Sequence, residues 1–301
     1  MNLAVNIGKL KLKNPIICAS GTFGFGDELK GLADFSSIGA VVSKTITVDP
    51  KEGNLPPRIY ETDCGVINSI GLANPGVDSF IKEKLPALGK LQTKHIISLG
   101  GFSEKEYKQL IKKLDKQKEV DAFELNLSCP NLGKKKLISQ SQKLTYNLIK
   151  NLRKLTKKPL IAKVTPEVTD IIEIAKAVSD AGADAVSMVN TYFSLAIDIE
   201  TKKSYLGNIS GGYSGPAIKP MSLYKVWQAA NSIDIPVIGG GGITNYKDAI
   251  EFFLAGSTAV SLGTINLAYP NAAESILAEI KKYMKKNKMK NLGNLRRSFN
   301  G

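Results

Sequence analysis

The sequence predicts an α/β protein, a closed barrel of eight parallel strands, because short apolar runs alternate along the chain with segments of helical periodicity. Eight such runs are continuous in apolar residues, rich in β-branched side chains and bounded by Gly, Pro or Asn. Continuous runs are typical of parallel strands buried on both faces, and helices supply the crossovers that parallel strands need. The number of runs favours a (β/α)8 TIM barrel.

In chain order, the expected strands are 15–20, 40–46, 95–100, 122–128, 159–165, 185–190, 236–240 and 258–263. The stretches 168–181 and 245–255 are amphipathic, as expected of helices that cover a barrel. Segments 181–187 and 255–261 echo each other, each with a glycine suited to ending a helix before the next strand. An open doubly wound sheet is the alternative, but the glycines of 21–26 lack the spacing of its dinucleotide-binding fingerprint.

We expect a single domain covering residues 1–301, since no linker or low-complexity segment interrupts the sequence. Residues 1–13 are expected to form a hairpin that closes the bottom of the barrel, and residues 281–301 form a basic tail. The connections 47–75, 129–142 and 191–220 are longer than a barrel requires. Because each follows a predicted strand, these connections are expected to build a site and its lid.

The composition, 43% hydrophobic and 23% charged, predicts a globular protein. Residues 1–15 interleave lysines with apolar residues instead of carrying a signal-peptide core, so we expect the protein in the cytoplasm. No apolar run approaches the roughly 18 residues of a membrane-spanning helix. The 3 cysteines are widely separated, which fits neither a disulfide framework nor a zinc site, so we expect no metal. A net charge of +14 permits a nucleic-acid-binding interpretation, but the excess lysines are scattered and no recognisable motif accompanies them. We therefore expect neither a membrane nor a nucleic acid as partner.

A thiol directly after the fourth predicted strand is the centre of the candidate site. Cys129 follows the run 122–128 and is flanked by Asn126 and Asn131, and the proline after it forces the strand to end. Taken alone, Cys129 could equally be a small buried hydrophobe. A thiol can act as a base near neutral pH, however, because its unperturbed pKa is about 8.5.

Two lysines and two groups of glycines predict an anionic ligand at the barrel mouth. Lys44 and Lys163 lie within apolar strands near their C-terminal ends, where each must either extend to the mouth or meet an anion. Glycines 239–242 end the seventh strand, and Gly263 with Thr264 ends the eighth. Barrels commonly bind phosphate at these two positions, so the pattern favours a phosphate-bearing ligand.

Amide side chains gather at the predicted strand ends as well. They are Asn68, Asn126, Asn131 and Asn190, and Thr191 accompanies them. An amide both donates and accepts hydrogen bonds, so it suits a planar heterocycle that carries carbonyl and N–H groups. Any one of them could be a turn residue. Grouped around one thiol, they predict a flat, polar substrate.

The sequence resembles class 1 dihydroorotate dehydrogenases nearly from end to end. The segments that carry the resemblance, in the right order, are 19–26, 68–72, 126–131, Lys163, 190–191, 211–220 and 263–264. The resemblance implies an FMN-containing (β/α)8 barrel, with one FMN per chain, that oxidises dihydroorotate to orotate in pyrimidine biosynthesis.

The resemblance also implies roles for individual residues. Cys129 would be the base that removes the C5 proton of dihydroorotate while hydride passes to the flavin, and Lys163 would stabilise the negative charge of the reduced ring. The implied cofactor-binding residues are Ser20, Lys44, Thr45, Ser98, Asn126, Lys163, Val189, Gly215, Gly241, Gly242, Gly263 and Thr264. The implied substrate-binding residues are Lys44, Asn68, Ser69, Ile70, Gly71, Leu72, Asn126, Asn131, Asn190 and Thr191.

Within class 1, the segments 24–26 and 211–220 resemble the 1B type. That type implies a homodimer core and a second subunit, which carries FAD and a 2Fe-2S cluster and passes electrons to NAD. Ser98 departs from the pattern, which has asparagine there, and the loop after Cys129 is shorter and more basic than usual. Open alternatives are a fumarate-linked 1A enzyme and a pyrimidine reductase resembling dihydropyrimidine dehydrogenase, although Asn131 argues against the reductase.

Overall fold

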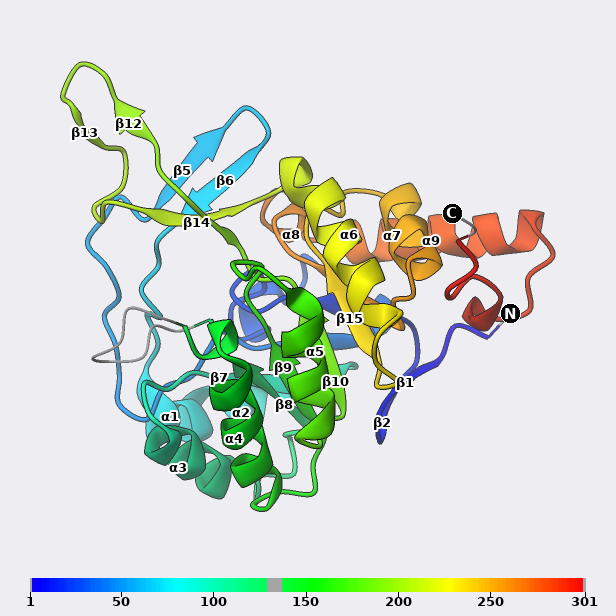
Figure 1. Cartoon of the computed structure of the whole chain (residues 1–301), viewed down its shortest axis with the longest axis horizontal. Helices are drawn as coiled ribbons and strands as arrows, with labels where there is room; N and C mark the ends of the chain where they lie inside the picture. The colour runs from blue at the N-terminus through cyan, green and yellow to red at the C-terminus, as the bar shows by residue number, and fades with distance from the viewer. Residues whose placement is uncertain (1, 129–136, 300–301) are drawn as a thin grey trace.

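The structure, a computed structural model, describes residues 2–128 and 137–299. Its centre is a closed barrel of parallel strands that pair in chain order, the last with the first (Figure 1). These strands are β3 (Ile16–Cys18), β4 (Ala40–Val42), β7 (Lys94–Leu99), β8 (Ala122–Asn126), β9 (Leu160–Lys163), β10 (Ala185–Met188), β15 (Val237–Gly240) and β16 (Ala259–Leu262). The predicted (β/α)8 barrel is confirmed, and closure of the sheet excludes the open doubly wound alternative.

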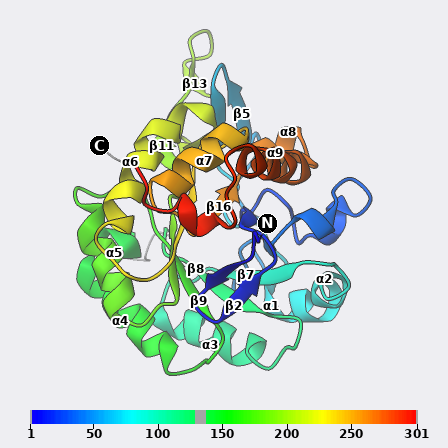
Figure 2. The same ribbon diagram turned by 90° about the vertical axis from the view of Figure 1, so that its right-hand side faces the viewer.

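Helices surround the barrel (Figure 2). They are α1 (Gly76–Ser79), α2 (Leu85–Leu88), α3 (Glu104–Leu114), α4 (Gln142–Arg153), α5 (Ile171–Asp180), α6 (Lys219–Ala230), α7 (Tyr246–Leu254), α8 (Ile265–Ala268) and α9 (Ala272–Lys286). The two amphipathic stretches form α5 and α7, and the glycine after each, Gly182 and Gly256, has a positive φ of 86° and 114°. Among the described helices, none has the length and apolar character needed to cross a membrane.

The connection between β3 and β4 departs from the predicted alternation, because 3-10 turns at Asp27–Leu29 and Phe35–Ser37 take the place of an α-helix. The segment 19–39 is rich in glycine, which disfavours a helix through its conformational freedom. Phe23 and Phe35 are buried and meet edge to face, with ring centroids 6.1 Å apart. They cover this part of the barrel where a helix was expected.

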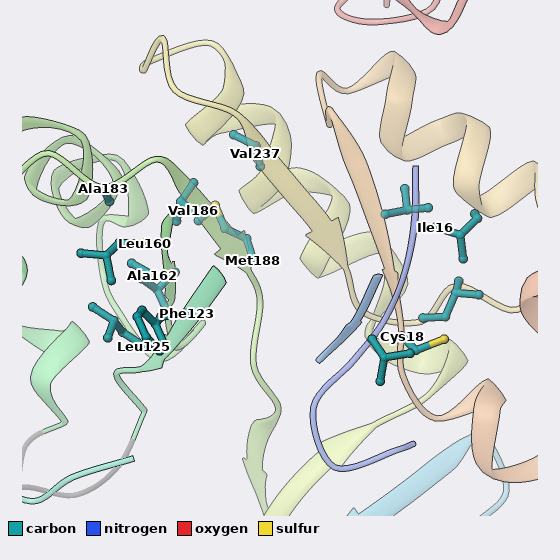
Figure 3. Close-up of a cluster of buried hydrophobic side chains, with 14 of the residues drawn as sticks. Ile16, Cys18, Phe123, Leu125, Leu160, Ala162, Ala183, Val186, Met188 and Val237 are labelled. Carbon is teal, nitrogen blue, oxygen red and sulfur yellow. The ribbon is translucent and has the colours of Figure 1, made fainter. Parts of the chain in front are cut away.

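Side chains of the barrel strands alternate between two apolar layers. Phe123 and Leu125 of β8 point outward into the layer between strands and helices, together with Cys18, Val186 and Val237 of other strands (Figure 3). The inner layer contains Ala122 of β8 and corresponding residues of the other strands. Strand alternation therefore places the remaining polar residues of β8, Glu124 and Asn126, on the inner face above Ala122.

A hairpin packs against the apolar end of the barrel interior. Strands β1 (Val5–Ile7) and β2 (Leu10–Leu12) pair antiparallel, and their buried side chains pack against the inner apolar layer. The polar side chains of the inner face consequently lie toward the other end, where the carboxyl ends of the strands meet.

A second sheet lies over that end and is built from two of the long connections. It comprises β11 (Tyr192–Ser194), β14 (Gly211–Ser214), β6 (Gly65–Asn68) and β5 (Ile59–Thr62), in that order. The hairpin of β12 (Ile197–Asp198) and β13 (Lys203–Ser204) projects beyond it (Figure 1). At the other extreme of the chain, part of the basic tail packs on the barrel: Leu295 is buried, and Arg297 donates to the carbonyl of Ile233 at 2.9 Å.

Candidate active site

A cavity of about 610 Å3 opens between the carboxyl ends of the barrel strands and the outer sheet. Its volume lies within the range of cofactor and substrate pockets. The predicted site residues that line it are Ser20, Asn68, Ile70, Lys163, Val189, Asn190, Thr191, Gly215, Gly241, Gly242, Gly263 and Thr264. Residues scattered over more than 240 positions of sequence are thus brought together, because parallel strands end at one face of a barrel.

Three further predicted residues connect to the cavity wall through hydrogen bonds. Thr45 Oγ1 lies 3.4 Å from Ser20 Oγ and 2.9 Å from Ser98 Oγ. Asn126 Nδ2 donates to the same Thr45 oxygen at 3.3 Å. This network holds the inner-face residues of neighbouring strands in register below the cavity wall.

The two strand lysines occupy different positions. Lys163 is the last residue of β9 and lines the cavity, as predicted. Lys44 lies two residues beyond β4 and outside the residues that line the cavity, so its predicted place within a strand is wrong. The ladder is interrupted here, where the backbone N–H of Lys44 donates to the carbonyl of Gly24 at 2.8 Å, and pairing with β7 resumes only as an isolated bridge between Ile46 and Leu99.

The predicted substrate segment, residues 68–72, leaves β6 in a tight loop. Asn68 Nδ2 donates to the carbonyl of Gly212 at 3.2 Å, which ties the amide to the neighbouring strand β14. Ser69 Oγ accepts from Asn54 Nδ2 at 2.7 Å, and Ser69 does not line the cavity. Gly71 and Leu72 both have positive φ, 73° and 57°, and neither lines the cavity. A left-handed leucine is uncommon and is a form of strain that clusters at functional sites.

The predicted base Cys129 and the predicted substrate ligand Asn131 lie outside the described residues. Hydrogen bonds hold the chain that leads to them: the backbone N–H of Leu127 donates to the carbonyl of Lys163 at 3.1 Å, and Tyr107 Oη donates to the carbonyl of Asn126 at 2.7 Å. On the far side of the connection, Ser139 Oγ donates to the carbonyl of Leu127 at 3.1 Å. Both ends of the segment that carries the thiol are therefore anchored to the barrel.

The predicted phosphate-binding glycines leave bare backbone at the cavity wall. Gly241 and Gly242 have φ of 110° and 81°, a conformation that L side chains rarely adopt. A Cβ at Gly263 would meet nothing within 4 Å, so the backbone there faces open space. Thr264 Oγ1 donates to Ser214 Oγ at 2.8 Å and joins the end of β16 to the outer sheet. Such a wall allows close approach of an anionic group to backbone N–H groups.

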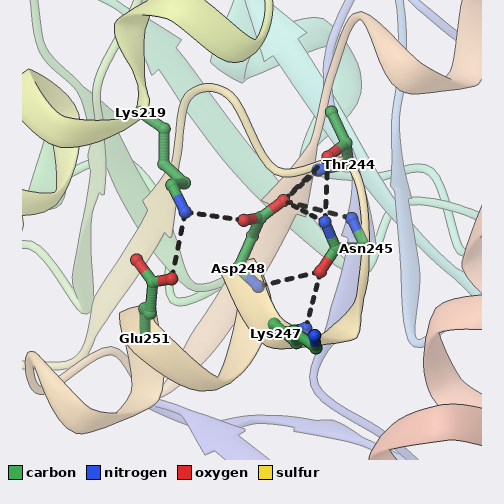
Figure 4. A network of polar contacts seen from close by, with 6 residues as sticks. All are labelled: Lys219, Thr244, Asn245, Lys247, Asp248 and Glu251. Carbon is green, nitrogen blue, oxygen red and sulfur yellow. Dashed lines mark hydrogen bonds and ion pairs between the residues drawn. The ribbon is translucent and has the colours of Figure 1, made fainter.

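A polar network that the sequence analysis missed borders this glycine wall, since a Cβ at Gly242 would meet Lys219. Figure 4 shows the residues of the network. Lys219 at the start of α6 contacts Asp248 Oδ1 at 2.7 Å and Glu251 Oε1 at 3.0 Å. Asp248 Oδ2 in turn accepts from the backbone and hydroxyl of Thr244, both at 2.8 Å, and from Asn245 Nδ2 at 2.9 Å. The network therefore fixes the loop after β15 to the first turns of α6 and α7. The Asn-x-x-Asp spacing at 245–248 was the available sequence signal, a capping box.

Comparison with known proteins agrees with this geometry. The sequence model of the family described as Dihydroorotate dehydrogenase matches residues 2–284. Curated relatives described as the catalytic subunit of dihydroorotate dehydrogenase B (NAD(+)) include those of Thermoanaerobacter pseudethanolicus, 46% identical over 98% of each chain, and Caldicellulosiruptor bescii, 46% identical over 100% of each. That of Geobacter metallireducens is 45% identical over 95% of this chain and 94% of its own. The chain belongs to the dihydroorotate dehydrogenase family.

Proposed function

We propose that this chain oxidises dihydroorotate to orotate in pyrimidine biosynthesis, as the catalytic subunit of an enzyme of the 1B, NAD-linked type. The observation that carries the proposal is the convergence of Lys163, the amides and the glycine wall on one cavity, in a chain whose 45–46% identical relatives are described as that subunit. The relatives favour this function over the fumarate-linked and pyrimidine-reductase alternatives.

The family is flavin-dependent, and the cavity suits one FMN per chain. When bound, FMN supplies the hydride acceptor that the oxidation requires. The glycine wall at 241–242 and 263 would receive the phosphate, and Lys163 would lie by the ring system. The remaining cofactor contacts that we propose are Ser20, Lys44, Thr45, Ser98, Asn126, Val189, Gly215 and Thr264.

The protein's own groups would bind and orient dihydroorotate and move one proton. Cys129, as thiolate, would remove the proton from C5 of the substrate. The ammonium of Lys163 would stabilise negative charge that develops in the cavity, because a fixed cation needs no reorganisation during the reaction. The substrate contacts that we propose are Lys44, Asn68, Ser69, Ile70, Gly71, Leu72, Asn126, Asn131, Asn190 and Thr191.

The role of the thiol is tested by Cys129→Ala. Cys64→Ala is the control, since Cys64 is a free, exposed thiol in the turn between β5 and β6 that also lines the cavity, so the comparison separates loss of the base from loss of any thiol at the cavity wall. We expect the Cys129 variant to retain FMN and to lose roughly 100-fold or more in turnover, the usual contribution of a general base. The Cys64 variant should keep near-wild-type turnover. Full turnover by Cys129→Ala at neutral pH would rule out the proposed mechanism.

We propose further that the chain forms a homodimer and receives a second subunit carrying FAD and a 2Fe-2S cluster. Exposed apolar side chains on and beside the outer sheet support association there, and they include Ile59, Phe193, Leu195, Ile197, Ile199 and Ile209. A cluster of this kind commonly marks an interaction surface. The mass of Phe193→Asp, measured by light scattering, tests the dimer; a mass that remains dimeric would show that the interface lies elsewhere.

Reduction of NAD by the isolated chain would contradict the need for a second subunit.

A further inference from the structure

Glu124 is a buried carboxyl that the proposed mechanism does not use. It lies in the middle of β8 and is only 3% exposed. Alternation along the strand puts it on the inner face of the barrel, between Ala122 of the apolar floor and Asn126 at the mouth. A carboxyl buried in this position lowers the stability of the fold unless neighbouring groups form hydrogen bonds with it or balance its charge.

The surroundings of Glu124 supply incomplete compensation. Its Oε1 atom has no hydrogen-bond partner among residues 2–128 and 137–299. The hydroxyl of Ser187 on β10 stabilises the ionised carboxylate, whereas Ser98, its neighbour in register on β7, is bonded to Thr45. The charge of Lys163 on β9 favours the ionised form of this carboxyl.

Strand register places this lysine close above the acid. Asn126 pairs with Lys163, and Lys163 pairs with Ser187, so these residues form one inward-facing level across β8, β9 and β10. Glu124 precedes Asn126 by two residues, which is one inward step, about 7 Å along the strand. The acid therefore lies directly below the level at which Lys163 enters the cavity.

We propose that Glu124 is a positioning residue that acts through Lys163: the carboxyl lies one inward level below the ammonium, without a direct ion pair, and its charge state sets how much positive charge the ammonium presents to an anion above it. A neutral Glu124 leaves the ammonium uncompensated, whereas an ionised Glu124 offsets it. The coupling of Glu124 to Lys163 stands by itself; its effect on a bound flavin rests on the function proposed above.

Burial favours the neutral form of this acid. Desolvation raises the pKa of Glu124 above its ordinary value, and the charge of Lys163 and the hydroxyl of Ser187 only partly oppose the shift. Removal of the Lys163 charge should therefore raise the pKa of Glu124 further.

The pair is tested without cofactor, in the full chain labelled with carbon-13 at glutamate side-chain carboxyls. The Glu124 resonance is assigned by its absence from Glu124→Gln and is followed with pH in wild type, Lys163→Met, Lys163→Arg and Lys44→Met. We expect its midpoint to rise in Lys163→Met, to stay near the wild-type value in Lys163→Arg, and not to move in Lys44→Met, which removes the same charge elsewhere. The proposal is overturned if the titration midpoint of Glu124 is the same in Lys163→Met as in wild type, or if it moves as far in Lys44→Met as in Lys163→Met.

The consequence for the cofactor is tested by the midpoint potential of bound FMN between about pH 5 and 9, a range that covers upward shifts of a carboxyl pKa. We expect the wild-type potential to fall with an additional step where Glu124 ionises, and Glu124→Gln to lack that step. Asp121→Asn is the matched control, because Asp121 precedes β8 at the closed end and pairs with Lys94 at 2.7 Å. Coincident potential curves for Glu124→Gln and wild type would overturn the proposed action on flavin. A chain that shows the coupled titration but binds no FMN would instead contradict the proposed function and leave the pair intact.

Discussion

At the scale of single residues, Gly242 shows why the glycine wall does not tolerate a side chain. Its φ is 81°, and a Cβ added there would lie 2.8 Å from the backbone nitrogen of Lys219. Because that neighbour is backbone at the start of α6, the loop itself would have to move. Glycine is therefore required at position 242 both by its positive φ and by the close approach of the Lys219 backbone.

We predict that Gly242→Ala weakens FMN binding by about tenfold or more, roughly the effect of the 1–3 kcal/mol that such strained positions cost. Fluorescence titration of the apoprotein with FMN measures the change. Gly31→Ala is the control, since Gly31 has a similar φ of 88° but a Cβ there would meet nothing within 4 Å. Equal losses in both variants would show that the wall contributes nothing specific.

Asp248 gives a prediction for pH. Burial opposes ionisation of this carboxyl, but the ammonium of Lys219 and the donors of Thr244 outweigh it and hold the pKa of Asp248 below its usual value. Its contribution to stability is therefore present above the unfolded-state pKa of about 3.9 and is lost as pH falls through the folded-state value. We predict that Asp248→Asn lowers the free energy of unfolding at pH 7, and that its difference from wild type shrinks as the pH approaches 3.

Urea unfolding at several pH values measures this difference. Glu251→Gln is the control: Glu251 makes a single contact with the same lysine and its side chain is 41% exposed, so we expect a much smaller change. A pH-independent gap between Asp248→Asn and wild type would contradict the assigned role of the carboxylate.

At the residue scale, strand ends, glycines and amides were visible as local patterns and located part of the cavity wall, and the family resemblance added Ser20, Val189 and Gly215. The part of the wall contributed by residues 59–66 was missed. Sequence reasoning also missed Glu124, which lies within a run that otherwise reads as apolar, since an acid's partner on a neighbouring strand depends on register. It also placed Lys44 inside a regular strand, because the hydrogen bond to Gly24 that interrupts the strand is a tertiary contact.

At the scale of elements, the eight barrel strands and the helices α5 and α7 were predictable from periodicity and capping residues. The outer sheet was not, although both connections that form it were recognised as long. Its central pairing joins β6 to β14 across 144 residues, Asn68 to Gly212, and each strand is only four residues long. Strands this short carry no clear period, and a pairing this distant leaves no local signal.

The outer sheet gives a prediction for substrate binding. A Cβ at Gly212 would lie 2.0 Å from Thr191 Oγ1, so Gly212→Ala should displace a proposed substrate contact. We predict a KM for dihydroorotate raised about tenfold, with a much smaller effect on FMN content, because the glycine wall at 241–242 and 263 lies on other strands and, of the proposed cofactor contacts, only Gly215 is adjacent to β14 in the chain. Steady-state kinetics and flavin absorbance separate the two effects. Thr201→Ala, in the turn beyond β12, is the control. Loss of FMN in parallel with the rise in KM would refute this division of the cavity.

At the scale of the whole molecule, the hairpin of β1 and β2 and the buried end of the basic tail tie both ends of the described chain to one barrel. Leu12 packs against the inner apolar layer of the barrel and is 1% exposed, and Arg296 donates to the carbonyl of Gly256 at 3.2 Å. We propose on this basis that the chain is a single domain. Calorimetry should then show one unfolding transition, and Leu12→Ala should lower its midpoint as a whole, since a buried Leu→Ala change costs about 2–5 kcal/mol. Two separable transitions would contradict a single domain.

The central claim, that this cavity binds FMN and oxidises dihydroorotate, is tested most directly by the anaerobic visible absorption spectrum of the purified chain before and after dihydroorotate is added. We predict a flavin absorption band that dihydroorotate bleaches, with one orotate formed for each flavin reduced. A chain that remains colourless after incubation with FMN, or a flavin band that dihydroorotate leaves unchanged, would contradict the claim.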